Sequence, residues 1–299
     1  MIIDSHSHIG KDCYWQESSL DNYISLCQKL NIEYSILMPV PNPVTQDIGL
    51  KCIYWEYNNN RYIYKSDIDV FDNPYKLIND YTYDLLKKSS IKEKFGFVPM
   101  VHPILDSIEY INEIIEKYNP LAIKIHGIST ATGPYDISEE LIKLLHKKDI
   151  PLIVHTDYCK KPTNAIEFLR KKNNPYDWAM FFINNEIKGY LTHGARMDKK
   201  VFDLVNSHDN LVIGIGPDFK INLERTRWVE ASDDDYLNII RDSVDTNKIL
   251  FDIDYSWNID SSKKLETNQI CRIKKIFTPK EKKKILAKNA INFFNIKEK

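Results

Sequence analysis

Eight short apolar runs, spread along the 299-residue chain, constrain its fold more than any other feature. Several are continuously apolar, which is typical of parallel strands that are buried on both faces. Polar turns and longer segments separate consecutive runs. The candidate strands are MIID (1–4), YSILM (34–38), FGFVPM (95–100), LAIKI (121–125), PLIVH (151–155), GYLTH (189–193), LVIGI (211–215) and KILFDI (248–253).

Amphipathic helical patterns lie between these runs, with apolar residues at three- and four-residue spacings. Ser138 and Thr278 are predicted N-caps, and Pro279 occupies a first helical position, where proline is favoured. Strands that alternate with helices in this number predict an α/β fold, a single (β/α)8 TIM barrel in one domain over 1–299. The candidate helices are 20–30, 107–118, 138–148 and 278–294.

The composition argues against several classes of protein. The 41 basic and 42 acidic residues are interspersed and give a net charge of -1, so we expect no nucleic-acid partner and no anionic membrane. Asp4 and His6 interrupt any signal-peptide core, and no apolar run approaches the ~18 residues of a membrane span. The five cysteines form no CxxC pair, which is typical of reduced thiols in a cytoplasmic protein.

Two connections are longer than plain crossovers. Residues 39–75 follow the second strand and residues 156–188 follow the fifth, so both are expected at the C-terminal face of the barrel, where active sites lie. We predict a lid insertion at 39–75 and a lid or substrate wall at 156–188. The alternative is that the aromatic residues of these segments only pack a bulky insertion.

Polar residues gather at the ends of the candidate strands. His6 and His8 are two apart on a β-segment, so both side chains point to the same face. A single histidine at a strand end is more often an ordinary hydrogen-bonded residue, but five of the eight histidines occupy such positions. These residues are His6 and His8, His126, His155 and His193, joined by Lys124, Asp252 and Asp254.

This pattern predicts a metal site. Imidazole and carboxylate ligands suit one divalent ion, with Zn²⁺ favoured and Mn²⁺ or Fe²⁺ as competitors. A site that is not saturated by protein ligands leaves room for water, whose pKa a metal lowers to about 7.

Five stretches in chain order resemble the amidohydrolase superfamily, specifically the amidohydrolase-related branch that includes aminocarboxymuconate-semialdehyde decarboxylase. IDSHSH resembles the acid-HxH motif of its first strand, LIVHT the fifth-strand histidine, and LTHGAR the sixth-strand histidine. ILFDIDYSW resembles the eighth-strand segment, in which an Asp precedes an aromatic residue. KILAKNAINFFNI resembles the closing helix.

The resemblance implies a set of roles. His6, His8, His155 and Asp254 would hold one metal ion. Asp254 would also move the proton, and His193 would act beside it as acid, base or polarising group. The implied enzyme is a metal-dependent hydrolase in which metal-bound water attacks an amide, lactone or ester carbonyl of a small molecule.

Three further residues are predicted to meet the substrate. Lys124 is either an unmodified lysine paired with an acid or a substrate carboxylate, which we favour, or a carboxylated lysine that bridges two metals, as in binuclear members. His126 shares the face of Lys124 and either contacts substrate or is an ordinary hydrogen-bonded residue. Arg196 follows His193 and suits a substrate carboxylate.

The strand-eight segment departs from the pattern of the branch, because Asp252 replaces a glycine and Ser256 a proline. Asp252 either hydrogen-bonds a ligand histidine or faces the outer helices. A decarboxylase or other lyase of the same fold is the first alternative function, since the branch contains both. A catalytically silent ligand-binding barrel is the second alternative. The presence of all five residues of the implied site argues against it: His6, His8, His155, His193 and Asp254. The 39–75 loop either caps its own barrel or packs on a second subunit of a homo-oligomer.

Overall fold

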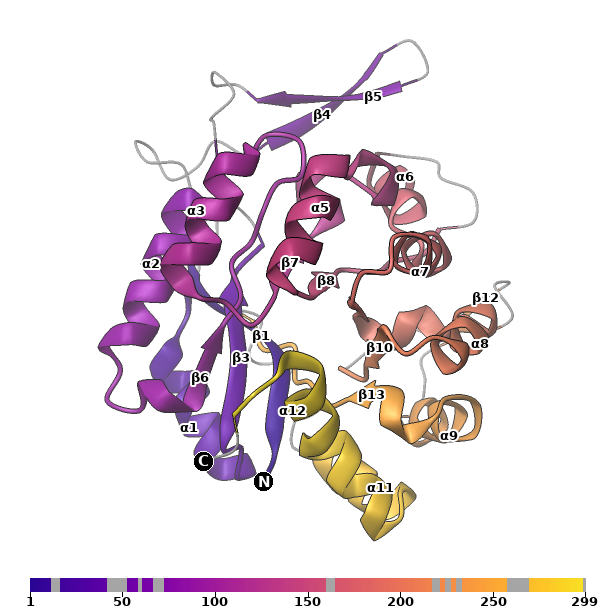
Figure 1. Cartoon of the computed structure of the whole chain (residues 1–299). Helices are drawn as coiled ribbons and strands as arrows, with labels where there is room; N and C mark the ends of the chain where they lie inside the picture. The colour runs from indigo at the N-terminus through magenta and orange to yellow at the C-terminus, as the bar shows by residue number, and fades with distance from the viewer. Residues whose placement is uncertain are drawn as a thin grey trace.

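The computed structural model describes residues 1–11, 17–41, 53–58, 61–66, 73–159, 165–216, 221–223, 227–229, 233–256 and 269–297. Parallel strands stand at the centre and helices cover them from outside (Figure 1). The barrel strands belong to two sheets, one with the order β2-β1-β3-β6 and one with the order β13-β10-β9-β8-β7. Their strands are β1 (Ile3–Lys11), β2 (Glu17–Ser18), β3 (Tyr34–Pro39), β6 (Phe95–Phe97), β7 (Ile123–Ile125), β8 (Leu152–Val154), β9 (Gly189–Leu191), β10 (Leu211–Gly214) and β13 (Ile249–Leu250).

Backbone hydrogen bonds join the two sheets at both seams. Met100, just past β6, forms a parallel bridge with Lys124 of β7, and the Lys124 N–H donates to the Pro99 carbonyl at 2.9 Å. At the other seam the Ser5 N–H of β1 donates to the Phe251 carbonyl, just past β13, at 3.0 Å. The eight predicted strands therefore form a closed ring, and the prediction of a TIM barrel is confirmed.

The helices begin where the sequence places their caps. The side chains of Ser107, Ser138 and Thr278 accept hydrogen bonds from backbone N–H groups of the first turn. In the described part of the chain, no helix is long and apolar enough to cross a bilayer. The longer helices are α1 (Leu20–Leu30), α2 (Lys76–Lys88), α3 (Ile108–Tyr118), α5 (Glu139–Lys148), α6 (Ala165–Lys172), α7 (Pro175–Asn184), α8 (Lys199–Ser207), α9 (Asp233–Ser243), α11 (Pro279–Lys283) and α12 (Asn289–Phe294).

The helix predicted over 278–294 is interrupted. A π-helical turn, Lys284–Lys288, separates α11 from α12. The Ile285 carbonyl within this turn accepts a hydrogen bond from the Phe251 N–H at 3.2 Å. A π turn releases carbonyl groups from the regular helical ladder, so the interruption ties the last helix to the last strand.

Apolar side chains from all eight strand segments fill the lower barrel interior, and α12 closes it from below. We call this layer the floor. Helices pack against the outward faces of the same strands in a second, larger cluster. The floor consists of Ile3, Ile36, Met38, Val98, Ala122, Ile153, Tyr190, Val212 and Leu250, with Ala287, Ala290 and Phe294 from the closing helix.

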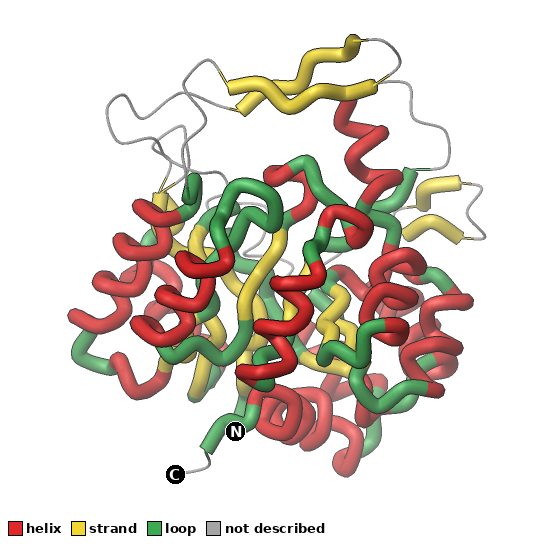
Figure 2. Tube along the Cα trace, turned by 45° about the horizontal axis from the view of Figure 1, so that its top comes forward, coloured by secondary structure: helices red, strands yellow, loops and turns green. Residues whose placement is uncertain are grey.

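The two long connections differ. Within 39–75, β4 (Ile53–Asn58) and β5 (Arg61–Ser66) pair as an antiparallel hairpin that stands beyond the carboxyl ends of the barrel strands (Figures 1 and 2). The rest of that connection, apart from 39–41 and 73–75, lies outside the described residues, so the lid stays a prediction. The described part of 156–188 supplies the helices α6 and α7, in which Trp178 and Phe182 are fully buried, whereas 160–164 lie outside the described residues, so the lid or substrate wall stays a prediction.

Candidate metal centre at the barrel mouth

The first strand directs two histidines into the barrel mouth. Its register against β3 shifts between Asp4 and Ser7, a β-bulge that the sequence did not reveal. The ring of His6, within the bulge, and the ring of His8, beyond it, lie edge to face, with centroids 4.9 Å apart. The prediction that both point to one face is therefore correct.

Asp4 anchors this bulge from behind. Its buried carboxylate accepts hydrogen bonds from the Ser7 hydroxyl at 2.5 Å, the Tyr23 hydroxyl of α1, the Ile253 N–H at 2.9 Å and the His6 N–H at 3.2 Å. Burial raises the pKa of Asp4 to about 6, and these hydrogen bonds oppose the rise. Asp4, the acid of the IDSHSH motif, thus holds the first and last strands together, and all of these contacts lie on the side away from the His6 and His8 rings.

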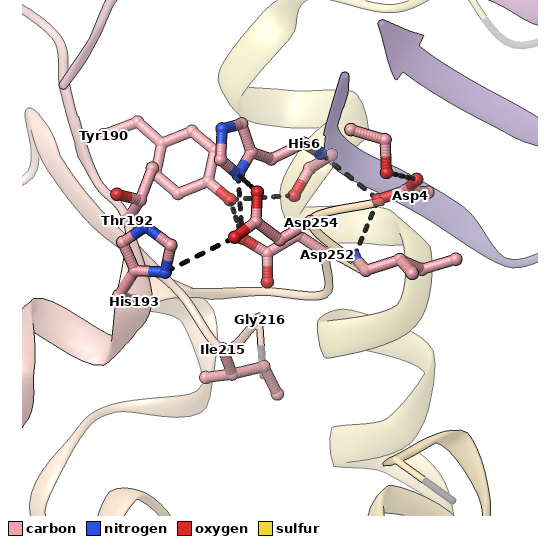
Figure 3. A network of polar contacts seen from close by, with 12 residues as sticks. Asp4, His6, Tyr190, Thr192, His193, Ile215, Gly216, Asp252 and Asp254 are labelled. Atoms are coloured by element: carbon pink, nitrogen blue, oxygen red, sulfur yellow. Dashed lines mark hydrogen bonds and ion pairs between the residues drawn. The ribbon is translucent and has the colours of Figure 1, made fainter. Parts of the chain in front are cut away.

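Asp254 reaches the histidines from the end of the eighth strand (Figure 3). Its backbone has a φ of 53°, and its N–H donates to the His6 carbonyl at 2.8 Å. One carboxylate oxygen lies 3.5 Å from His6 Nδ1 and 3.6 Å from His8 Nε2. One possible ligand atom from each of these three residues lies within 4.8 Å of the others, so the cluster is able to hold a metal ion.

His193 approaches the second oxygen of Asp254, with 3.7 Å between Nδ1 and Oδ2 (Figure 3). It opens a turn in which every residue from His193 to Met197 has a positive φ, between 46° and 57°. Left-handed backbone is costly for residues other than glycine, so this turn is strained. The small residues of HGAR were the only signal of it in the sequence.

His155 stands behind His193 and outside the cluster of three. Its Nδ1 lies 3.0 Å from His193 Nε2, and its ring packs on that of His126 with centroids 4.2 Å apart. The expected role of His155 as a metal ligand therefore stays a prediction.

Lys124 is fully buried on the inward face of β7. Its Nζ lies 3.1 Å from His6 Nε2. Desolvation lowers the pKa of Lys124 to about 7, against the opposing effect of the Asp254 and Asp252 carboxylates. Both interpretations of Lys124, as an unmodified lysine and as a carboxylated one, stay predictions.

The other two residues that we predicted to meet substrate make intramolecular contacts. His126 caps the short helix α4 (Gly127–Thr130), since its Nδ1 accepts from the Ser129 N–H at 3.2 Å. Arg196 donates from Nε to the Thr156 carbonyl at 2.9 Å and lies 3.8 Å from an Asp157 oxygen. Substrate contact by either residue stays a prediction.

The electrostatics of the mouth favour neutral imidazole. Burial lowers the pKa of His8 to about 3, and burial is also the first cause of the lowered pKa of His6, His155 and His193. Neutral imidazole is the form that binds metals, and the partly exposed Asp254 carboxylate completes a donor set suited to a divalent ion. The residues present therefore fit a metal ion of the zinc type.

Sequence reasoning missed Tyr190 and left Asp252 open. Asp252 lies inside the barrel, where its Oδ2 accepts a hydrogen bond from the Tyr190 hydroxyl at 2.6 Å (Figure 3). The alternative that Asp252 faces the outer helices is therefore wrong. A signal for Tyr190 did exist, because a buried tyrosine in a barrel strand needs a partner for its hydroxyl.

No protein-family model matches the chain. A curated relative, the tryptophan synthase alpha chain of Pelagibacter ubique (strain HTCC1062), is 24% identical over 155 residues. That match covers 52% of this chain and 52% of the relative, so this chain spans about half of that protein's length.

Solved structures match over nearly the full length. The 5-carboxyvanillate decarboxylase of Sphingomonas paucimobilis has a TM-score of 0.65 at 10% identity and covers 99% of both chains. A putative 2-pyrone-4,6-dicarboxylic acid hydrolase from Pseudomonas putida has a TM-score of 0.62 at 9% identity, over 100% of this chain and 98% of that one. An amidohydrolase from Burkholderia multivorans with bound zinc has a TM-score of 0.61 at 10% identity, over 99% and 100%. The chain therefore has the fold of the amidohydrolase barrels.

Proposed function

We propose that the chain is a metal-dependent enzyme of the amidohydrolase superfamily, and that it hydrolyses an amide, lactone or ester of a small molecule. One observation carries the proposal: His6, His8 and Asp254 offer ligand atoms within 4.8 Å of one another at the barrel mouth. Solved enzymes of the same fold include hydrolases and a structure with bound zinc, which supports the class of chemistry.

In the proposed site, His6, His8 and Asp254 hold one divalent ion, with His155 as a further ligand. The ion supplies Lewis acidity and lowers the pKa of a water molecule. Asp254 accepts the proton of the attacking water, because one of its oxygens faces the ligand histidines and the other lies 3.7 Å from His193. His193, which is buried, stabilises the charge on the partly exposed Asp254 carboxylate.

We propose a small substrate that bears a carboxylate, for which Lys124 and Arg196 supply cationic groups. Domain 1–299 acts as one barrel, and the hairpin of β4 and β5 belongs to the lid over its mouth. We propose a cytoplasmic location, because the five cysteines of the sequence form no CxxC pair. The alternative for the 39–75 loop is that it packs on a second subunit of a homo-oligomer.

Decarboxylation is the second candidate, because a decarboxylase is among the solved structures that share this fold. Both reactions use the same metal ligands and differ in where the proton goes. Hydrolysis places oxygen from water in the product, whereas decarboxylation releases CO₂ and delivers a proton to carbon.

The first experiment is the metal content of wild type and Lys124→Ala, purified without chelator and measured by plasma mass spectrometry. We expect about one equivalent in both proteins, as for a mononuclear site. About two equivalents in wild type with a clear loss in Lys124→Ala would instead make Lys124 a bridging carbamate. If the protein held no metal even after Zn²⁺ or Mn²⁺ was added, the catalytically silent ligand-binding barrel would be the remaining interpretation.

The second experiment separates the two reactions. The metal-loaded protein is incubated with 2-pyrone-4,6-dicarboxylic acid or 5-carboxyvanillate in ¹⁸O-labelled water, and the products are analysed by mass spectrometry. We expect ¹⁸O in the product of the lactone. Release of CO₂ from the carboxylated phenol without incorporation of label would favour the decarboxylase.

A further inference from the structure

We infer that a second binding site lies at the end of the barrel opposite the proposed metal site, and that it takes a small organic cation that carries an amine. The inference goes beyond the proposed reaction and does not depend on it. It rests on a cavity of about 580 Å³ between the closing helix α12 and the amino ends of strands β9, β10 and β13. Cavities of this volume are typical of sites for small molecules.

The cavity faces away from the barrel mouth. Lys188, Asn210 and Lys248 line it, and each lies just before a barrel strand, whereas the mouth lies at the carboxyl ends of the strands. Phe293 of α12 and Val212 of β10 add apolar surface to a lining that is otherwise polar. A ligand in this cavity therefore meets none of the residues that we place in the reaction.

Two asparagines of the cavity use their NH₂ groups inside the protein. Asn289, which is 6% exposed, donates to the Thr246 carbonyl at 2.6 Å and to the Ile249 carbonyl at 2.7 Å. Asn210 donates in the same way to two backbone carbonyls, at 3.0 Å and 2.7 Å. Only the NH₂ group of an amide can donate, so these bonds fix both side chains. Their oxygens make no hydrogen bond within the described residues and are acceptors for a ligand.

Both lysines of the cavity already have anionic partners. Lys248, which is 8% exposed, donates to the His208 carbonyl and to the Asp209 carboxylate, each at 3.0 Å. Lys188 Nζ lies 2.9 Å from a carboxylate oxygen of Asp149, a residue outside the cavity lining. The two ammonium groups are therefore paired before a ligand enters.

Two exposed carboxylates add negative charge to the lining. Glu186 forms no ion pair within the described residues. Asp245 accepts a hydrogen bond from the Asn247 N–H at 2.9 Å. This bond, and after it the charges of Lys284 and Lys248, hold the pKa of that carboxyl below its ordinary value, so it is ionised at neutral pH.

The cavity thus offers a ligand more acceptors than donors, and its acid Glu186 lacks a cationic partner in the described part of the chain. A protonated amine supplies both donors and positive charge. Its carbon chain fits the apolar surface of Phe293, whose ring face also attracts a cation. A carboxylate ligand would instead face Glu186 and Asp245, and the lysines that could hold it are already paired.

Three probes of equal chain length test this chemistry. Ammonium, hydroxyl and carboxylate groups end the chains of 1,4-diaminobutane, 1,4-butanediol and succinate, and each is titrated into the protein as purified and followed by ¹H–¹⁵N NMR. We expect 1,4-diaminobutane to bind with a dissociation constant of about 1 mM, and the other two about 10-fold more weakly. The backbone signals of Lys248 and Asn289 should shift, whereas those of His193 to Met197 should not.

Glu186→Gln removes the unpaired acid and keeps the shape of the side chain. We expect the dissociation constant of 1,4-diaminobutane to rise about 3- to 5-fold. Glu93→Gln is the matched control, because Glu93 is exposed, forms no ion pair within the described residues and precedes the third barrel strand at the same end of the molecule. This variant should bind as wild type does. Asn292→Lys, which adds an ammonium group to the cavity, should abolish binding.

The other outcomes overturn the inference. Tighter binding of succinate than of 1,4-diaminobutane would indicate an anion site at the lysines. The inference also fails if 1,4-diaminobutane does not bind, if all three probes bind equally, or if the shifts are confined to the mouth. Equal losses in Glu186→Gln and Glu93→Gln would indicate a general effect of surface charge. None of these results changes the metal content of the protein, so the inference and the proposed function fail separately.

Discussion

The floor and the mouth of the barrel are built on the same strands, but the floor buries apolar side chains and the mouth buries polar ones. At the floor, Ile153 and Leu250 are fully buried among other apolar side chains, and the backbone is regular. A few residues further along the same strands, His155 and Asp252 line a polar interior. The floor stabilises the fold through apolar burial, which is worth about 1.5–3 kcal/mol for each large aliphatic side chain.

The mouth carries costs that the floor does not. Two of its buried polar atoms, His6 Nδ1 and Asp252 Oδ1, have no hydrogen-bond partner among the described residues, and each such atom costs about 1–3 kcal/mol. Asp254 and the whole turn from His193 to Met197 have positive φ. Such features persist only when the rest of the structure imposes them, and they cluster at functional sites. The comparison predicts that substitutions at the floor change stability alone, that those at the proposed metal ligands change metal binding and catalysis, and that relief or increase of strain elsewhere in the mouth changes stability.

Asp254→Asn should have the largest effect. The amide keeps the shape of the carboxylate but cannot accept the proton of water, so we expect turnover to fall about 1,000-fold. The free energy of unfolding should change by less than about 1 kcal/mol, as for a substitution that leaves packing intact. Steady-state kinetics and urea unfolding measure the two effects. Turnover near that of wild type would remove Asp254 from its proposed role.

Ile153→Ala tests the floor. The side chain is fully buried, and its truncation leaves a cavity, so we expect a loss of about 3 kcal/mol in the free energy of unfolding. The folded protein should retain the metal content of wild type, measured in parallel by plasma mass spectrometry. A fall in metal affinity as large as the fall in stability would show that the two layers are coupled, and it would break the comparison.

Gly194→Ala adds a methyl group where the mouth is most strained. Gly194 has a φ of 57°, and a Cβ there would lie 2.5 Å from the Tyr236 hydroxyl oxygen. We expect a loss of about 2 kcal/mol in the free energy of unfolding, from backbone strain together with this contact.

Ala195→Gly is the reciprocal control, because Ala195 already has a φ of 46°. Glycine relieves that strain but adds entropy to the unfolded chain, so we expect a change between zero and about 1 kcal/mol in favour of the fold. A loss of stability in both variants would mean that backbone conformation is not the source of the effect.

The same division explains what the sequence could predict. Continuous apolar runs and 3.6-residue periods report burial, so all eight strands were located, and the helix over 20–30 has the predicted bounds. The spacing of His6 and His8 also reports direction, because β-structure alternates. Burial and side-chain direction depend on residues that are close in the sequence, so they can be predicted from short sequence patterns.

Other features depend on contacts between distant segments. The π turn at Lys284–Lys288 reflects a hydrogen bond from Phe251, and the position of Asp252 inside the barrel depends on Tyr190 and two glycines of another strand. Neither the π turn nor the position of Asp252 changes the periodic pattern of apolar residues in the sequence. The bulge after Asp4 and the left-handed turn after His193 are likewise imposed by tertiary contacts. The sequence therefore brought His6, His8 and Asp254 together in one hypothesis without showing how the fold holds them.

Asp106→Asn should have the smallest effect, and one that depends on pH. Asp106 lies in the loop that follows the third barrel strand, on the mouth side but outside the group of His6, His8 and Asp254. Burial raises its pKa from 3.8 to about 7, so the folded protein holds this proton more tightly than the unfolded chain. Stability therefore falls as pH rises from about 4 to about 7, because folding then disfavours the charged form.

Asparagine stays neutral and removes this dependence. We expect the variant to exceed wild type by about 1–2 kcal/mol at pH 8, which is less than the full shift implies because the NH₂ group of the asparagine must also be buried. The advantage should shrink towards pH 4, and urea unfolding at pH 5 and pH 8 measures it. The difference between variant and wild type isolates Asp106 from the buried histidines, which titrate in both proteins. A difference independent of pH would show that the pKa of Asp106 is not raised in the fold, and that its carboxylate is charged there although it is buried.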